Sequence, residues 1–284
     1  MAVLLAALSS VAFGSGDLVG GIAIRRSGRP DAAVATASIS SVVAAVICGL
    51  ALLVAPPDRL TGNDVAWAAA AGLIMTVTRP LLYLGMARGP VTVFAPGYGL
   101  AAITLPAVVG PLVGQGLVGW EVFGVLVALP AVALLSGEGR LLRPAEVVRS
   151  HVLGLALLVG TSIGLSGLFY SFIDEAAGLA PAAIAMTVGA VLLPTYAAAR
   201  PAPTPYRSVG VPAVALGGTT AVAFMLSTAA YQRGVAAVVT ALICLAPGVS
   251  ILLAWRFLGE RVARLQLVGG LLGIVVVVCF ALAA

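Results

Sequence analysis

The chain has 284 residues, of which 61% are hydrophobic and only 9% charged, and its formal net charge at neutral pH is +5. A soluble globular domain has about 45–50% apolar and about 25% charged residues, so this composition indicates a membrane protein. All fifteen positive side chains are arginines scattered among short connectors, which argues against nucleic-acid binding. The three cysteines lie far apart in apolar stretches and match no metal or redox motif, so no cofactor is predicted.

Ten apolar stretches are long enough to cross a bilayer, which takes about 20 residues of helix. The predicted fold class is therefore an all-α integral membrane protein with ten transmembrane helices. In chain order, the predicted spans are 2–24, 32–54, 65–87, 90–112, 118–136, 152–173, 180–199, 209–231, 235–255 and 263–284. The connectors between them are too short to hold a separate soluble domain.

The arginines divide unevenly between the two sets of connectors. The odd-numbered connectors hold twelve, the even-numbered ones hold only Arg59 and Arg233, and Arg79 lies inside the third span. Positive charge is retained on the cytoplasmic side of a membrane. We therefore expect the odd connectors in the cytoplasm and both termini outside, in the cytoplasmic membrane of a bacterium. The sixth connector, outside in this orientation, is acidic and contains Asp174 and Glu175.

The first span contains one acid, Asp17, in the stretch FGSGDLVGG. A charged side chain at that depth costs roughly 2.5–3.5 kcal/mol on insertion scales and usually faces a cavity or a partner. Arg79 lies at matching depth, because Asp17 precedes Arg25 by eight residues and Arg79 precedes Arg88 by nine. Two interpretations remain open: a static ion pair between Asp17 and Arg79 that fixes helix packing, and a site that binds a proton or a substrate carboxylate during transport.

Polar side chains also recur at helical spacing along other spans, and such stripes are expected to face the interior of the bundle. There they either contact substrate or only hydrogen-bond neighbouring helices. Together with Asp17, the candidate residues for substrate or proton binding are Thr76, Arg79 and Tyr83 in the third span, Tyr98 in the fourth, Ser162, Ser166 and Tyr170 in the sixth, and Thr220, Ser227 and Tyr231 in the eighth.

Small residues and prolines add two expectations about the helices. Gly16 and Gly20 form a pattern that favours close packing of the first helix against a neighbour. The tripeptide APG occurs in the fourth span at 95–97 and again in the ninth at 246–248. Because proline inside a helix frees a carbonyl group and allows a kink, we interpret both sites as hinges or cavity walls.

The two halves of the chain resemble each other. Short motifs recur at a separation of 145 residues: Arg-Gly at 88–89 and 233–234, and Gly-Gln at 114–115 with Gly-Glu at 259–260. Each half has five spans, and because five is odd, the second half enters the membrane in the opposite sense. The sequence therefore predicts two inverted five-helix repeats, 1–145 and 150–284, in one membrane unit. Inverted repeats are typical of alternating-access transporters, in which the substrate binds near the midplane.

Three stretches, AFGSGDLVGGIAIRR at 12–26, LLYLGMARGPVTVFAPG at 81–97 and FLGERVARLQLVGGLLGIVVV at 257–277, resemble the EamA branch of the drug/metabolite transporter superfamily. The resemblance covers nearly the whole chain. It implies two inverted five-helix repeats around a central cavity lined mainly by helices 1, 3, 4, 6, 8 and 9, and export or exchange of small metabolites such as amino acids. The chain departs from the family at Gln115, where Glu is usual, and the family has no shared substrate motif that would name site residues.

These observations favour a secondary transporter, not an enzyme, that exports amino acids or other amphiphilic metabolites. A multidrug efflux carrier is the main alternative, and a channel is a further one. The chain has no phosphate-binding motif for an ATP-driven pump, and it lacks the cluster of His, Asp or Glu that a lipid-modifying enzyme would need. The expected partners are membrane lipid, a small-molecule substrate and, as a coupling ion, the proton, with no nucleic acid; a monomer is compatible with the sequence.

Overall fold

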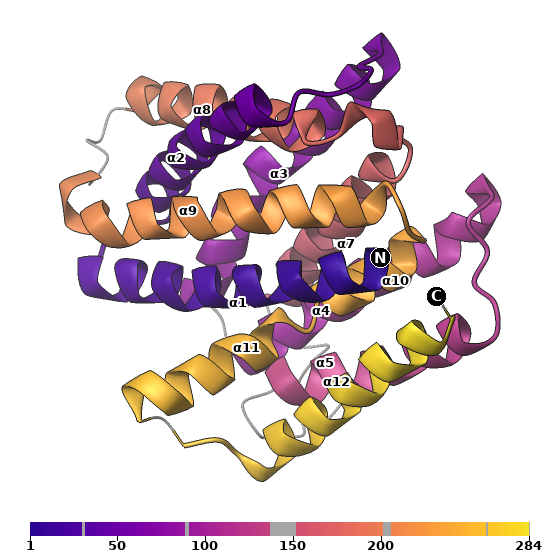
Figure 1. Cartoon of the computed structure of the whole chain (residues 1–284). Helices are drawn as coiled ribbons and strands as arrows, with labels where there is room; N and C mark the ends of the chain where they lie inside the picture. Colours follow the sequence, from indigo (N-terminus) through magenta and orange to yellow (C-terminus); the bar gives the residue numbers. More distant parts are fainter. Residues whose placement is uncertain (30–31, 89–90, 137–151, 201–205, 260, 284) are drawn as a thin grey trace.

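The computed structural model describes every residue except 30–31, 89–90, 137–151, 201–205, 260 and 284. All regular elements in the described part are helices, which run back and forth between two ends of one bundle (Figure 1). The N- and C-termini lie at the same end, which we call the terminus end. The arginines of the fifth connector and the repeat residues Gly89 and Glu260 lie outside the described residues.

The helices of the first half follow the predicted spans closely. They are α1 (Ala2–Ser27), α2 (Ala32–Val54), α3 (Gly62–Arg88), α4 (Val91–Val109) with the short 3-10 helix η1 (Gly110–Val113), and α5 (Trp120–Ser136). Four of these helices are long and apolar enough to cross a membrane, and α5, with 17 residues, is a shorter apolar helix.

The helices of the second half also lie close to the predicted spans. Its elements are α7 (Leu153–Tyr170), the 3-10 helix η2 (Glu175–Ala177), α8 (Ala180–Ala199), α9 (Tyr206–Tyr231), α10 (Ala236–Ile243), α11 (Ala246–Leu253), the π-helix η3 (Ala254–Leu258) and α12 (Arg264–Ala283). In the described residues as a whole, nine segments are long and apolar enough to cross a membrane when the segment Ala236–Phe257 is taken as one. The prediction of an all-helical membrane protein is confirmed.

The ninth predicted span differs from expectation, because the single helix predicted for 235–255 is two helices. The helix is interrupted at Cys244 and Leu245, and α11 starts with the APG tripeptide. Pro247 has no amide hydrogen and its ring would clash with the preceding turn, so it suits the first turn of a new helix and not the middle of an old one. The matching Pro96 lies inside a continuous α4.

The helices pack in pairs that are distant in the sequence. α1 lies alongside α9, α4 alongside α7, and α5 alongside α12, while α2 contacts both α8 and α9. Close approach depends on glycine: a Cβ atom on Gly16 would lie 2.8 Å from the Oγ1 atom of Thr219 on α9. The packing role predicted for Gly16 is thus confirmed.

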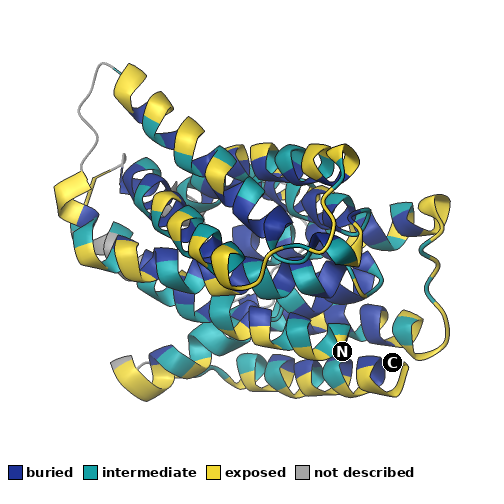
Figure 2. Cartoon of the chain, turned by 45° about the horizontal axis from the view of Figure 1, so that its top comes forward, coloured by how far each residue is buried: buried dark blue, intermediate teal, exposed yellow. Residues whose placement is uncertain are grey.

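The outer surface of the bundle is apolar. Along α12, for example, Leu267, Leu271, Ile274 and Val278 are 50% to 65% exposed, at helical spacing on one face. Figure 2 shows such exposed residues along the outward faces of many helices, whereas buried residues concentrate on the faces turned inward. A surface of this kind suits a hydrocarbon surrounding, in which helices gain nothing by hiding leucine or valine.

Candidate functional site

A cavity of ≈ 120 Å³ lies inside the bundle, about midway along α1. Its walls come from α1, α3, α4, α5, α7, α9 and the break between α10 and α11. The family resemblance implied a cavity lined by helices 1, 3, 4, 6, 8 and 9, which in the structure are α1, α3, α4, α7, α9 and α10 with α11. The contribution of α5 is additional. The lining residues of α3, α4 and α5 lie mostly in the halves of those helices far from the terminus end, so the cavity is displaced toward the other end of the bundle.

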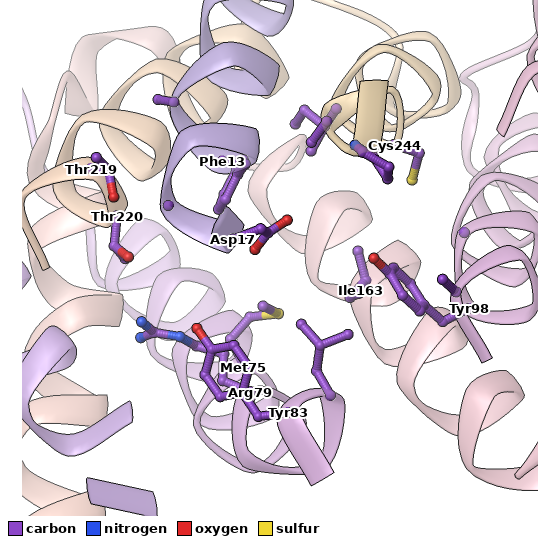
Figure 3. A pocket seen from close by; sticks show the side chains of 18 of the residues that line it. Phe13, Asp17, Met75, Arg79, Tyr83, Tyr98, Ile163, Thr219, Thr220 and Cys244 are labelled. Atoms are coloured by element: carbon purple, nitrogen blue, oxygen red, sulfur yellow. The ribbon is translucent and has the colours of Figure 1, made fainter. Parts of the chain in front are cut away.

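Asp17 projects from α1 into this cavity (Figure 3). Asp17 is an exposed residue, but the space that it faces is this cavity, which is surrounded by protein. None of the hydrogen bonds or ion pairs found among the described residues uses its carboxylate. Unpaired carboxylates inside a membrane usually mark a pathway for substrates or ions.

Arg79 lines the same cavity from α3 and is only 6% exposed. Its guanidinium group donates one hydrogen bond to the Oγ atom of Ser41, at 2.8 Å, and another to that of Ser40, at 3.0 Å. Both serines belong to α2 and are fully buried. An ion pair between Arg79 and Asp17 is not among those of the described residues. In this conformation two neutral hydroxyl groups hold the cation, so its charge is not cancelled by an acid.

Three more of the predicted residues line the cavity, namely Tyr83, Tyr98 and Thr220. Tyr83 lies beside Arg79, and Tyr98 reaches in from the opposite wall (Figure 3). Phe13 and Phe224 close the side nearer the terminus end, with their rings packed edge to face at a centroid distance of 5.5 Å. The described lining therefore combines one carboxylate, one guanidinium cation and a few hydroxyl groups with apolar walls.

Four predicted residues satisfy their hydroxyl groups within their own helices and do not line the cavity. They donate to backbone carbonyl oxygens three or four residues earlier: Thr76 to Gly72 at 2.7 Å, Ser162 to Leu158 at 2.8 Å, Ser166 to Ile163 at 2.9 Å and Ser227 to Phe224 at 3.1 Å. Such local bonds compete with any contact to a ligand. For these positions the structure favours the packing interpretation over substrate contact.

Tyr170 and Tyr231, also predicted, form a stacked pair outside the cavity lining, nearer the terminus end. Their ring centroids are 6.1 Å apart, and both side chains are buried. The hydroxyl groups of Tyr231 and Thr240 are hydrogen-bonded at 3.0 Å, whereas that of Tyr170 has no partner among the described atoms. The pair adds an aromatic layer between α7 and α9.

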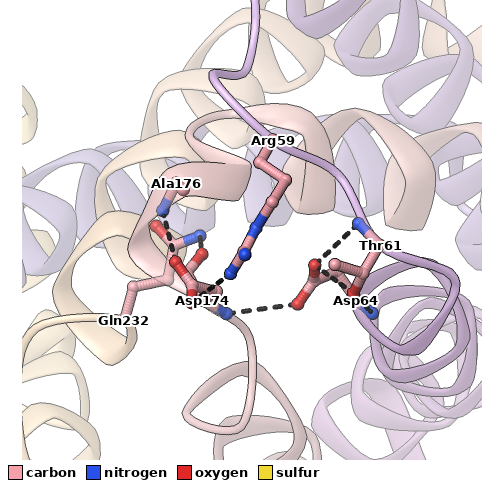
Figure 4. Close-up of polar contacts among 6 residues, drawn as sticks. All are labelled: Arg59, Thr61, Asp64, Asp174, Ala176 and Gln232. Carbon is pink, nitrogen blue, oxygen red and sulfur yellow. Dashed lines mark hydrogen bonds and ion pairs between the residues drawn. The ribbon is translucent and has the colours of Figure 1, made fainter.

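Polar contacts join the connectors at the terminus end (Figure 4). Arg59, between α2 and α3, forms an ion pair with Asp174, between α7 and α8, at 3.2 Å. The backbone N–H of Asp174 donates to the carboxylate of Asp64 at 3.2 Å, and the side-chain amide of Gln232 donates to the carbonyl oxygen of Asp174 at the same distance. A second ion pair joins Arg233 to Glu175 at 2.7 Å.

Gln115 joins the same end from the connector before α5. Its amide nitrogen donates to the Oγ atom of Ser171 at 2.8 Å, and its amide oxygen accepts from the backbone N–H of Ala236 at 3.1 Å. We call the contacts of Arg59, Asp64, Gln115, Asp174, Glu175, Gln232 and Arg233 the terminus-end network. It connects residues of both halves, and its contacts were not among the predictions from the sequence.

Comparison with known proteins agrees with this architecture. Residues 151–282 match the EamA-like transporter family. The resemblance to the EamA family is confirmed for this part of the chain. This family belongs to the drug/metabolite transporter superfamily. Its members are transporters, which agrees with a non-enzymatic role for the chain.

One solved structure, titled only as the crystal structure of a protein, is similar over 96% of this chain and 96% of its own. Its TM-score is 0.70 and its sequence identity 16%, so the likeness concerns the fold alone. No curated protein matches the sequence.

Proposed function

We propose that this EamA-type protein is a secondary transporter that exports small amphiphilic metabolites, foremost amino acids, by alternating access. The observation that carries the proposal is the cavity in which Asp17 and Arg79 both face the interior without pairing to each other. A charge held at this depth without its counterion costs free energy, and a ligand that supplies the counterion recovers it.

The chemistry of the lining suits a zwitterion with an apolar side chain. The carboxylate of such a ligand would bind the Arg79 guanidinium, and its ammonium group would bind the Asp17 carboxylate. Phe13, Met75 and Ile163 offer apolar contact for the remainder of the molecule. Multiply charged solutes fit this lining less well, because Arg79 is the single cation among its described residues.

Helix breaks support a transport site at the same place. The interruption between α10 and α11 puts Ile243, Cys244, Ala246 and Pro247 on the wall of the cavity. Transporters commonly bind substrate where a transmembrane helix is discontinuous near the midplane, since irregular backbone is tolerated there only if it faces a cavity or protein.

The contacts between helices support the inverted repeat that alternating access requires. If α1 corresponds to α7, α2 to α8, α3 to α9, α4 to α10 with α11, and α5 to α12, then the contact of α1 with α9 has its counterpart in that of α7 with α3. The contact of α4 with α7 is likewise matched by that of α10 and α11 with α1. The pairs α2 with α8 and α5 with α12 join each helix to its own counterpart, as expected beside a twofold axis.

The two ends of the bundle suggest which state this is. The terminus-end network ties both halves together on one side, and the cavity is displaced toward the other. With both termini outside, as the arginine distribution predicts, this is an inward-facing state closed to the outside. A C-terminal reporter that works only in the cytoplasm should be inactive, and activity would reverse the orientation.

Counterflow in proteoliposomes tests the proposed function directly. Vesicles loaded with an unlabelled amino acid should accumulate the same labelled amino acid transiently, and uptake should saturate. Ser162→Ala is a suitable matched control, because Ser162 bonds its own helix and does not line the cavity. Saturable flux of lipophilic drugs without any amino-acid counterflow would indicate the multidrug carrier instead, and non-saturable flux would indicate a channel.

A further inference from the structure

A second and larger cavity, of ≈ 1210 Å³, is a groove on the outside of the bundle between α1, α11 with η3, and α12. α1 and α12 make little direct contact across it. Its walls are apolar, and much of the lining is open to the surroundings: Val11, Leu252, Leu271 and Ile274 are 48% to 65% exposed. In a bilayer this groove would be filled by hydrocarbon.

The length of the groove matches one leaflet. Along α12 its lining runs from Gln266 to Val277, a distance of eleven residue steps along the helix. At about 1.5 Å per residue the groove is therefore ~16 Å long. One leaflet contributes about half of a hydrocarbon core that is ~30 Å thick. The groove thus extends from one membrane surface to about the midplane, as an acyl chain of that leaflet does.

The surface end of the groove is positively charged. Arg261 lines it there together with Trp255, and no acidic residue occurs among the described lining residues. Arg256 and Arg264 lie within a few residues in η3 and at the start of α12, and both are exposed. η3 is a π-helix, a local irregularity that often occurs at functional sites, and it contains Trp255, which is 53% exposed. Tryptophan favours the membrane–water interface.

We propose that this groove binds an anionic phospholipid, with an acyl chain between α1 and α12 and the phosphate group on Arg261. Basic pockets between transmembrane helices are suited to acidic head groups, and acidic lipids concentrate in the cytoplasmic leaflet, the side on which the arginine distribution places Arg261. The site does not overlap the central cavity, since the two share no lining residue. Its occupancy is independent of what the protein transports.

Quenching of Trp255 fluorescence by brominated lipid tests the proposal. The full-length protein is reconstituted in phosphatidylcholine. This lipid is then replaced stepwise by phosphatidylglycerol with brominated acyl chains. Quenching should saturate at a low fraction of phosphatidylglycerol, whereas brominated phosphatidylcholine should quench only in proportion to its amount. The saturable part should vanish in Trp255→Phe, which separates Trp255 from the other two tryptophans.

Two variants address the two parts of the ligand. Arg261→Gln should raise the fraction of phosphatidylglycerol needed for half-saturation about fivefold, the effect expected of one lost arginine near an acidic headgroup. Arg207→Gln, on the same side of the bundle and outside the groove, should not. Gly270→Leu should abolish saturable quenching by filling the groove, since a Cβ at Gly270 meets no atom within 4 Å and the backbone can accept it.

Gly218→Leu is the matched control for the bulk of the new side chain, because Gly218 is equally unobstructed and lines neither cavity. Thermal unfolding in detergent verifies that each variant is folded. Equal quenching by both brominated lipids would overturn the proposal, as would unchanged saturation in Gly270→Leu. Displacement of the brominated lipid by inorganic phosphate alone would show a site for free phosphate and would also overturn it.

Discussion

The central cavity and the terminus-end network use charge in opposite ways. At the terminus end each arginine faces an acid, with Arg59 on Asp174 and Arg233 on Glu175. In the cavity an acid and an arginine line one small space and remain apart, the arginine held by two serines. The difference indicates that the first group of charges joins the two halves at one end of the bundle, and that the second group is available to a ligand.

Energetics strengthen the contrast. Arg59 and Asp174 have side chains that are 66% and 50% exposed, and an exposed ion pair contributes only about 0–1 kcal/mol to stability. Such weak contacts can break and re-form, which suits a gate between two states better than a permanent clamp. Arg79, in contrast, is 6% exposed, and a buried charge without a counterion is costly to keep. That cost is understandable if the charge binds substrate.

The largest expected effect is on transport in Arg79→Gln. A charge-assisted hydrogen bond is worth about 1.5–3 kcal/mol, so loss of the guanidinium should reduce counterflow of an amino acid about ten- to hundredfold. The thermal unfolding temperature should stay unchanged or rise, because a buried charge is removed. A fall in unfolding temperature with unchanged counterflow per folded molecule would make Arg79 a purely structural residue.

Asp17→Asn separates two uses of the acid in the cavity. If Asp17 binds the substrate's ammonium group, counterflow and pH-driven uptake should fall together, by about tenfold for a lost charged hydrogen bond. Both are measured in the same proteoliposomes and corrected for folded protein. Surviving counterflow with lost pH-driven uptake would instead assign Asp17 to a coupling proton. No loss in either assay would contradict both uses.

The network can be tested as a gate with a native thiol. Cys244 lines the cavity, whereas Cys48 and Cys279 are 0% and 3% exposed. In right-side-out vesicles the double variant Arg59→Gln/Arg233→Gln should label about two- to thirtyfold faster with a membrane-impermeant maleimide. Two ion pairs of ~0.2–1 kcal/mol each would shift the population of the outward-open state by this amount.

The control for this labelling experiment is Cys244→Ala, which should remove the signal in every background. Inside-out vesicles of the unchanged protein should label faster than right-side-out vesicles, because the cavity is displaced away from the terminus end. Equal labelling of the double variant and the unchanged protein from outside would show that the network is not a gate.

The spans could be predicted from the sequence, because a stretch of about twenty mainly apolar residues in a chain of this composition indicates a transmembrane helix. The interruption of the helix at Cys244 could not be predicted, because Pro247 is compatible both with a bent helix and with the start of a new one. Pro96 demonstrates the ambiguity: the same tripeptide leaves α4 continuous. The outcome depends on what packs against each helix, and one sequence does not contain that information.

The cavity was partly predictable. Asp17, Arg79, Tyr83, Tyr98 and Thr220 were predicted and line it. Thr76, Ser166 and Ser227 are buried in the bundle, as the stripes predicted, but they do not line the cavity. A hydroxyl group in a helix can bond its own backbone, so its position in a stripe does not show whether it reaches a ligand.

The ion pairs of the terminus-end network correspond to a feature of the sequence, the position of two arginines in the even-numbered connectors. Arg59 and Arg233, the two exceptions to the arginine asymmetry, are the ones that pair with the acids of the sixth connector.

The smallest effect, and the finest test of the network, is expected at Gln115. Its amide donates to Ser171 and accepts from the N–H of Ala236 at the start of α10. A carboxylate keeps only the acceptor, and Ser171 already donates its own hydrogen to the carbonyl oxygen of Leu168 at 2.7 Å. Gln115→Glu should therefore put two acceptors face to face and lower the free energy of unfolding by about 0.5–1.5 kcal/mol at neutral pH.

The pH dependence of this loss identifies its cause. Protonation gives the new Glu side chain an O–H donor, so the stability of Gln115→Glu should approach that of the unchanged protein as the pH falls and the carboxylate is protonated. Gln115→Ala removes donor and acceptor together, and its deficit should not change with pH relative to the unchanged protein. Unfolding of all three proteins in the same detergent over a pH series measures both differences. If the deficit of Gln115→Glu stayed constant over that series, the bond to Ser171 would not be what Gln115 contributes, and this part of the network would hold by shape and not by hydrogen bonding.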